Sequence, residues 1–272
     1  MSTDYVHGYS DAEAVRLADQ ATSLTGLLHA GTRYPAGSRV LEAGCAVGAQ
    51  TVILAANSPA ASIVALDISA PSLAEAQRQV SRAGLGHVTF CRGDIYHPPF
   101  APGSFDHVFV SFVLEHLPDP VAALGALQTV LRPGGSITVI EGDHGSAYFH
   151  PDHAGARRAI QCLIDLQARA GGDSLIGRRL YPLLVQAGFR DVAVSPRMVY
   201  VDASRPDLVD GFTRKTFTAM VEGVGGQAVS EGLISDADWA AGIVGLHRAA
   251  EDDGTFCYTF FKAEACRGIL TS

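Results

Sequence analysis

A histidine and an aspartate, His144 and Asp143, follow an apolar run that ends at Glu141. Imidazole titrates near neutral pH, so His144 can accept a proton from a hydroxyl nucleophile or a cationic intermediate, and the adjacent carboxylate can orient the ring. The alternative is a histidine bonded to a loop carbonyl. The first interpretation makes His144 a general base, assisted by Asp143.

Two further histidines, His150 and His153, follow in the same stretch. Their spacings from His144 match no standard zinc motif, and no helical register brings the three rings together. We therefore predict no metal site, and we expect this stretch to contact the substrate.

A glycine-rich stretch carries the features of a ligand-binding loop. An apolar run predicts a buried strand that ends near Glu42, and a helix is expected from Gln50 onward. Between them, Gly44 and Gly48 let the backbone approach a ligand, and the helix N-terminus offers free N–H groups. Glu42 can orient a cationic ligand group or cap the loop.

A second expected strand, residues 62–68, carries Asp67 at its carboxyl end. In nucleotide-binding α/β units, an acid at this point accepts hydrogen bonds from ribose hydroxyls. The alternative is that Asp67 caps the helix expected to start near Pro71. The matching glycine loop favours ribose binding.

The spacing of the loop separates two classes of cofactor. A dinucleotide fingerprint requires G-x-G-x-x-G, whereas this chain reads Glu42-x-Gly44-x-Ala46-x-Gly48. The pattern resembles the first motif of the class I S-adenosylmethionine (SAM) methyltransferases, with Ala46 in place of the middle glycine of E-x-G-x-G-x-G. The alternative is a nicotinamide-dependent oxidoreductase, but this chain lacks the glycine pattern that such an enzyme requires.

Four further stretches resemble the same family and follow in the family's order. They are Asp67-Ile68, Gly93-Asp94-Ile95, the segment from Asp106 to His116, and Leu131-Arg132-Pro133-Gly134-Gly135. The pattern is similar to the type 11 or ubiquinone-biosynthesis-like branch, whose members use SAM. It implies an α/β fold with a seven-stranded, mostly parallel Rossmann-like sheet, an antiparallel last strand, an N-terminal helix and a helical cap insertion.

The resemblance also implies roles for single residues. Asp94 is expected to accept the adenine amino group, although an aspartate before Pro98 is also common in turns. Ile68 and Ile95 are expected to cover the two faces of the adenine ring. His116 is expected to pack or to anchor a loop. The full set of implied cofactor-binding residues is Glu42, Gly44, Ala46, Gly48, Gln50, Asp67, Ile68, Asp94, Ile95 and Ser111.

Ser111, near the end of the fourth expected strand, marks where the resemblance places the SAM methyl group. His144 follows the neighbouring fifth strand and is expected to be the residue closest to the chemistry. The implied acceptor is a small, largely apolar natural product or metabolite, methylated at carbon or oxygen, such as a prenyl, terpenoid or aromatic carbon. A noncatalytic SAM-binding scaffold is the other alternative.

Four segments are expected along the chain: an N-terminal lid or packing helix (1–34), a SAM-binding core (35–202), a helical cap (203–253), and the last strand with a tail (254–272). A hairpin between the last two strands would need only a few residues, so 203–253 is an insertion. Its apolar residues can cap the pocket or form an oligomer interface.

Composition narrows the choice of partners and compartment. The chain has 272 residues, 47% of them hydrophobic and 18% charged, and a formal net charge of −8. This charge argues against nucleic acid and anionic membranes as partners, since both require a basic face. Five cysteines without a C-x-x-C pair indicate a reducing cytoplasm.

Apolar patterning bears on membrane insertion and assembly. No apolar stretch approaches the roughly 18 residues that a membrane span needs. An amphipathic helix expected at residues 10–30, together with the insertion, exposes more apolar surface than one domain requires, which predicts a homo-oligomer.

Overall fold

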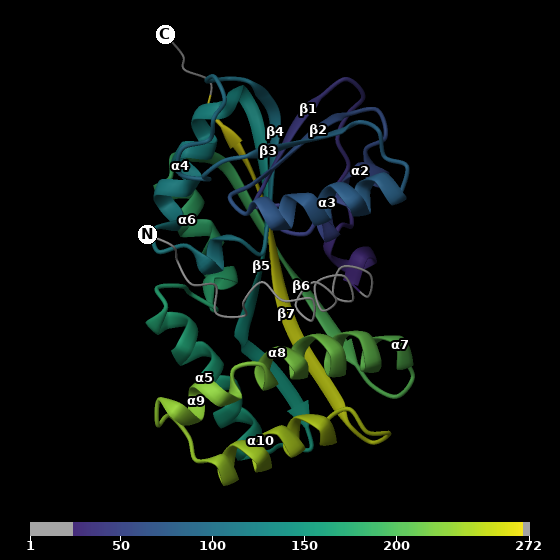
Figure 1. Ribbon diagram of the computed structural model, residues 1–272, viewed down its shortest axis with the longest axis vertical. Coiled ribbons are helices and arrows are strands. Elements are labelled where there is room, and N and C mark those ends of the chain that lie inside the picture. Colours follow the sequence, from purple (N-terminus) through teal and green to yellow (C-terminus); the bar gives the residue numbers. More distant parts are fainter. Residues whose placement is uncertain (1–23, 269–272) are drawn as a thin grey trace. The chain divides into compact units, whose positions relative to one another are not determined.

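The computed structural model describes residues 24–268, and seven strands along them form one sheet. The order across the sheet is β3-β2-β1-β4-β5-β7-β6 (Figure 1). The strands are β1 (Arg39–Ala43), β2 (Ser62–Asp67), β3 (Val88–Arg92), β4 (Phe105–Ser111), β5 (Leu131–His150), β6 (Phe189–Val201) and β7 (Thr255–Arg267).

Strands β1 to β5 run parallel to one another, and β7 runs antiparallel to its neighbours. Parallel strands are covered on both faces, so they are nearly continuous apolar runs, as in β1, where every residue after Arg39 is buried. The predicted mostly parallel α/β sheet with an antiparallel last strand is therefore confirmed.

Helices connect the strands, and their starts follow local sequence signals. Ser69 caps α3 and Asp119 caps α4, and a proline occupies the first turn of each helix. The main helices are α2 (Ala49–Asn57), α3 (Ala70–Arg82), α4 (Pro120–Val130), α5 (Ala154–Arg169), α6 (Leu180–Gln186) and α10 (Asp236–Arg248). Shorter segments are η1 (Leu114–His116), η2 (Ile176–Arg179), α7 (Pro206–Leu208), the π-helix η3 (Val209–Thr218), α8 (Ala219–Glu222) and α9 (Gly225–Ser230).

Most of the N-terminal helix expected at residues 10–30 lies outside the described residues. Within the part of this range that is described, residues 24–28 are helical. The stretch between β6 and β7, expected as an insertion, is helical for most of its length. Within residues 24–268, no helix combines the length and the apolar character needed to cross a membrane.

The chain divides into two compact units. Among the described residues, the first unit contains 28–141, 176–196 and 261–268, and the second contains 24–27, 142–175 and 197–260. Residues 142–175, expected within a core of 35–202, thus share a unit with the helical insertion. Strands β5, β6 and β7 contribute residues to both units.

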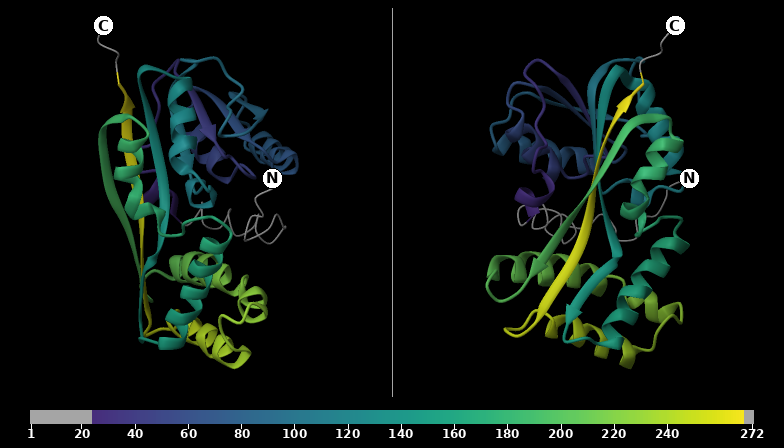
Figure 2. Two further views of the ribbon diagram at one scale, coloured as in Figure 1. Left: turned by 90° about the vertical axis from the view of Figure 1, so that its left-hand side faces the viewer. Right: turned by 180° about the vertical axis from the view of Figure 1, so that it is seen from behind.

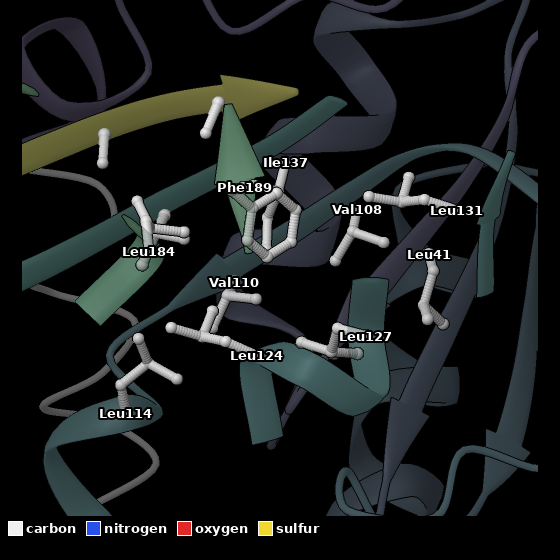
Figure 3. Packing of buried hydrophobic residues seen from close by; sticks show 14 of the residues in the cluster. Leu41, Val108, Val110, Leu114, Leu124, Leu127, Leu131, Ile137, Leu184 and Phe189 are labelled. Atoms are coloured by element: carbon white, nitrogen blue, oxygen red, sulfur yellow. The ribbon is translucent and has the colours of Figure 1, made fainter. Parts of the chain in front are cut away.

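The core of the first unit is aliphatic and lies between strands and helices (Figure 3). Side chains alternate between the two faces of a strand, so Val108 and Val110 of β4 point to one face, where Leu124 and Leu127 of α4 pack with them. Burial of each such side chain contributes about 1.5 to 3 kcal/mol. This packing fixes the strand ends that carry the candidate site.

The core of the second unit is aromatic. Alternate residues Phe256, Tyr258 and Phe260 of β7 meet Phe212 and Phe217 of the π-helix η3, with ring centroids 4.8 to 5.9 Å apart. Such ring pairs add stability beyond the area they bury. Figure 2 shows the helices of this unit on one face of its strands.

Candidate active site

The glycine-rich loop between β1 and α2 contains three left-handed residues at alternating positions. Gly44, Ala46 and Gly48 have φ angles of 81°, 46° and 87°. Glycine adopts this region freely, whereas an L side chain costs about 1 to 2 kcal/mol there. Ala46 therefore takes the conformation of the glycine that it replaces in the motif, and the loop keeps its shape at a small cost.

Both glycines of the loop also have a packing role. A Cβ atom on Gly44 would lie 2.5 Å from Cγ2 of Val113, which follows β4, and a Cβ atom on Gly48 would lie 2.8 Å from Cα of Ala76 in α3. Sequence reasoning attributed these glycines to a tight turn and to ligand approach. The structure adds that only glycine lets neighbouring elements pack against the loop.

Asp67 ties the end of β2 to the glycine-rich loop. Its Oδ2 accepts a hydrogen bond from the Ala46 N–H at 2.8 Å, and its Oδ1 accepts one from the Ser69 N–H at 2.8 Å. Burial raises the pKa of Asp67, and these N–H donors act in the opposite direction. Each carboxylate oxygen retains a second acceptor position for a hydroxyl group. Of the two possible cap residues in this stretch, Ser69 caps α3 and Asp67 does not.

The loop after β3 lies beside the end of β2, because the Gly93 N–H donates to the Asp67 carbonyl at 3.0 Å. Ile68 is 60% exposed, and Ile95 packs partly against the core. Asp94 organises a turn: its Oδ1 accepts from the Tyr96 N–H at 2.9 Å. Asp94 therefore stabilises a turn, and its expected contact with adenine stays a prediction.

Buried polar atoms without a hydrogen-bond partner gather in this part of the first unit. Among the described residues, they are His29 Nδ1, Glu42 Oε2, Ser111 Oγ and Glu141 Oε2. Glu42 is the residue before the last of β1, Ser111 is the last residue of β4, Glu141 lies midway along β5, and His29 bonds to Gln50 of α2. An unsatisfied buried polar group costs about 1 to 3 kcal/mol, so such a cluster fits a site completed by a polar ligand.

Glu42 is the most perturbed acid of the motif. It is 2% exposed, and burial raises its pKa to about 8, with a further contribution from Asp67 and an opposing one from the Thr51 hydroxyl. A neutral carboxyl that can ionise next to a cation suits the binding of a cationic ligand group. The geometry therefore permits the role expected for Glu42.

Two residues of this site were missed by sequence reasoning. His29 Nε2 lies 2.6 Å from Gln50 Oε1, and the His29 ring lies against Phe109 with centroids 5.6 Å apart. Glu141 accepts hydrogen bonds from the Val113 and Leu114 N–H groups. The acid at the end of an apolar run was a usable signal for Glu141, whereas no local pattern marks His29.

His144 lies in the second unit and has a partner from a distant strand. Its ring Nδ1 is 2.7 Å from the Tyr258 hydroxyl, and the ring meets Phe217 edge-on. Its backbone N–H donates to the Ser174 carbonyl at 2.9 Å. The Asp143 carboxylate accepts from the Gly145 N–H at 3.1 Å. The structure therefore gives an orienting contact to Tyr258, which sequence reasoning missed, and the general-base role of His144 stays a prediction.

Two further histidines, His153 and His116, have side-chain contacts. His153 caps α5, since its Nδ1 accepts a hydrogen bond from the Ala156 N–H at 3.1 Å. His116 Nε2 lies 3.6 Å from Glu115 Oε1, and the expected packing or loop-anchoring role of His116 stays a prediction. Within the described residues, no three histidine, cysteine or acidic side chains come together as metal ligands would.

Known proteins resemble this chain in sequence and in fold. Residues 41–139 match the model of a family described as a methyltransferase domain. An uncharacterised 37.1 kDa protein of a Streptomyces fradiae transposon is 34% identical over 190 residues, or 69% of this chain and 54% of that protein. The demethylmenaquinone methyltransferase of Thermus thermophilus is 36% identical over 106 residues, or 39% of this chain and 48% of that enzyme.

A solved geranyl diphosphate methyltransferase in complex with SAM superposes with a TM-score of 0.51 at 16% identity, covering 92% of this chain and 85% of that one. At this identity the likeness concerns the fold. The chain spans about half the length of these two relatives.

Proposed function

Residues 41–139 form a domain of the class I SAM-dependent methyltransferase family, and from this premise we propose that the chain transfers a methyl group from SAM to a small, largely apolar acceptor. The acceptor is a natural product or metabolite, methylated at carbon or oxygen, such as a prenyl, terpenoid or aromatic carbon. SAM supplies a methyl group on a sulfonium, activated for in-line displacement. The protein has to align the two reactants and exclude water.

The observation that carries this proposal is the cluster of unsatisfied buried polar atoms beside the glycine-rich loop. We assign Glu42 Oε2 to a cationic group of the cofactor and Asp67 to its ribose hydroxyls. The adenine ring is assigned to Ile68, Asp94 and Ile95. The remaining expected contacts are Gly44, Ala46, Gly48, Gln50 and Ser111.

The acceptor class is supported by the aromatic side chains of the second unit. Phe212, Phe217, Phe256 and Phe260 are all buried there, so this unit offers apolar rather than charged surroundings. The Thermus relative is named for demethylmenaquinone, and the solved enzyme is named for geranyl diphosphate. The aromatic surroundings in this chain support a largely apolar acceptor.

His144 is proposed as the base that removes a proton from the acceptor. A neutral imidazole can accept a proton, and the contact of Nδ1 with the Tyr258 hydroxyl orients the ring. Burial of the ring keeps competing water away. Asp143, next to it in β5, is retained as an assisting residue.

The decisive experiment incubates the purified chain with methyl-labelled SAM and a metabolite extract, followed by mass spectrometry of the products. A labelled product of low polarity is expected. Binding of SAM without any labelled product would favour the noncatalytic scaffold. Binding of NADPH without binding of SAM, measured by calorimetry, would favour an oxidoreductase.

We also propose a cytoplasmic homo-oligomer. Tyr148, Met198 and Val244 are each at least 62% exposed, and large exposed apolar side chains are typical of association surfaces. Light scattering at micromolar concentration should give a mass above 28.5 kDa. A monomeric mass would contradict the proposal.

A further inference from the structure

Glu141, the last residue of β5 within the first unit, is fully buried and holds a neighbouring loop. One carboxyl oxygen, Oε1, accepts hydrogen bonds from the Val113 N–H at 3.0 Å and from the Leu114 N–H at 2.8 Å. These two groups lie at the start of the short helix η1, where backbone N–H groups lack partners within the helix. Glu141 supplies those partners.

The loop that Glu141 holds departs from regular backbone geometry. Phe112 has a φ angle of 56°, which bulky side chains rarely adopt, and its N–H donates to the Ile140 carbonyl at 2.9 Å. Strained residues of this kind persist only where surrounding contacts hold them. Two consecutive residues of β5, Ile140 and Glu141, provide those contacts.

The held loop in turn packs against the glycine-rich loop. The Val113 side chain fills the space beside Gly44, where a Cβ atom would lie 2.5 Å from Val113 Cγ2. The hydrogen bond from the Val113 N–H to Glu141 therefore fixes the side chain that supports Gly44. Contacts run without a break from β5, through the loop after β4, to the glycine-rich loop after β1.

We infer that Glu141 is a positioning residue for the cofactor site: its carboxyl group holds residues 112–114 against Gly44 and thereby fixes the shape of the glycine-rich loop. Burial and the nearby Glu115 raise the pKa of Glu141 well above its usual value. A glutamine has the same length, with an oxygen that can accept both hydrogen bonds. Glu141→Gln should therefore still hold residues 112–114 in place, and Glu141→Ala should not.

Hydrogen exchange in the ligand-free protein provides the first test. The Val113 and Leu114 amides should exchange at least about tenfold faster in Glu141→Ala than in the wild type, because both lose their acceptor. In Glu141→Gln they should stay protected. Equal protection in the wild type and Glu141→Ala would overturn the inference, and this readout does not depend on any ligand.

Calorimetric titration with S-adenosylhomocysteine provides the second test. Loss of two hydrogen bonds predicts a fall in affinity on the order of 10- to 100-fold for Glu141→Ala, with Glu141→Gln within about threefold of the wild type. Equal losses in both variants would contradict a positioning role. Glu264→Gln, at an exposed acid of β7, is the matched control and should bind like the wild type.

Glu141→Asp keeps the test decisive if Glu141→Ala does not fold. Its carboxyl is one methylene shorter and cannot reach both N–H groups, so we expect faster exchange and weaker binding than in Glu141→Gln. If the wild type itself fails to bind S-adenosylhomocysteine, the cofactor assignment fails, and the exchange measurement still decides the role of Glu141.

Discussion

The two units of the molecule present polar groups in different ways. In the first unit the candidate site is made largely of backbone: a loop with three left-handed residues, and N–H groups tied to Asp67 and Glu141. In the second unit it is made of side chains, with His144 bonded to Tyr258 among phenylalanine rings.

This difference has a physical origin and a consequence. A loop shaped by glycines depends on a few adjacent residues, so its pattern survives in many sequences and is visible as a motif. A cluster of aromatic side chains depends on residues that are distant in sequence, and many combinations of them fill the same volume. We therefore expect the first unit to carry the general function of the family and the second unit to carry the choice of acceptor.

The largest effect is expected in the second unit. His144→Ala should lower turnover on the order of 10²- to 10⁴-fold and leave SAM affinity unchanged, since a general base acts in the chemical step. Single-turnover kinetics and calorimetry measure the two quantities. His247→Ala, at a half-exposed histidine of α10 that pairs with Glu222, is the matched control. A fall of less than about tenfold would show that alignment, not a base, accounts for the rate.

In the first unit, Gly44→Val should destabilise the fold by about 3 kcal/mol or more, because it adds both overpacking and an unfavourable φ. Unfolding in urea measures the change. Gly37→Val provides the control, since Gly37 also has a positive φ of 79° but nothing lies within 4 Å of its Cβ position. If both variants lose the same stability, the contact with Val113 is unimportant.

The pH dependence of stability probes the buried acid of the motif. Because the folded-state pKa of Glu42 is about 8 and its usual value is 4.5, the folded protein holds the proton more tightly than the unfolded chain. The stability that protonated Glu42 contributes to the fold is fully present below pH 4.5 and is lost as the pH rises through 8. Glu42→Gln cannot titrate and should flatten the melting temperature over this window. An unchanged slope would show that Glu42 ionises normally.

Asp67→Ala should weaken SAM binding by about 1 to 3 kcal/mol, because it leaves the ribose hydroxyls and the Ala46 N–H without an acceptor. Calorimetric titration gives the affinity. Asp106→Ala is the control: Asp106 also accepts a backbone hydrogen bond, from Arg39 at the first residue of β1. Only Asp67→Ala should change the affinity, and equal losses would mean that a general loss of stability is responsible.

The smallest effect, with the opposite sign, is expected at Ala46. Ala46→Gly relieves the left-handed strain at φ 46° but raises the entropy of the unfolded chain, for a net gain of about 0.5 kcal/mol. Thermal unfolding measures it. Ala49→Gly, in the first turn of α2, should instead destabilise the protein. A loss at both positions would show that Ala46 is not strained.

Local sequence patterns located most strands of this fold but not all of their ends. Apolar runs predicted a strand that ends near Glu42 and another at residues 62–68, where β1 and β2 lie, whereas β5 was expected to end at Glu141 and continues to His150, so that His144 lies inside it. The spacing of Glu42, Gly44 and Gly48 predicted the cofactor class, because the shape of a tight loop depends on residues within it.

Only the tertiary structure decided which groups are partners. The pairs His144 with Tyr258 and Glu141 with Val113 are 114 and 28 residues apart in sequence, and neither partner carries a local signal for the other. Likewise, residues 142–175 join the second unit through packing that no boundary in the sequence marks. Periodicity sets the face on which a side chain lies, whereas its neighbour there depends on how strands and helices from distant parts of the chain pack together.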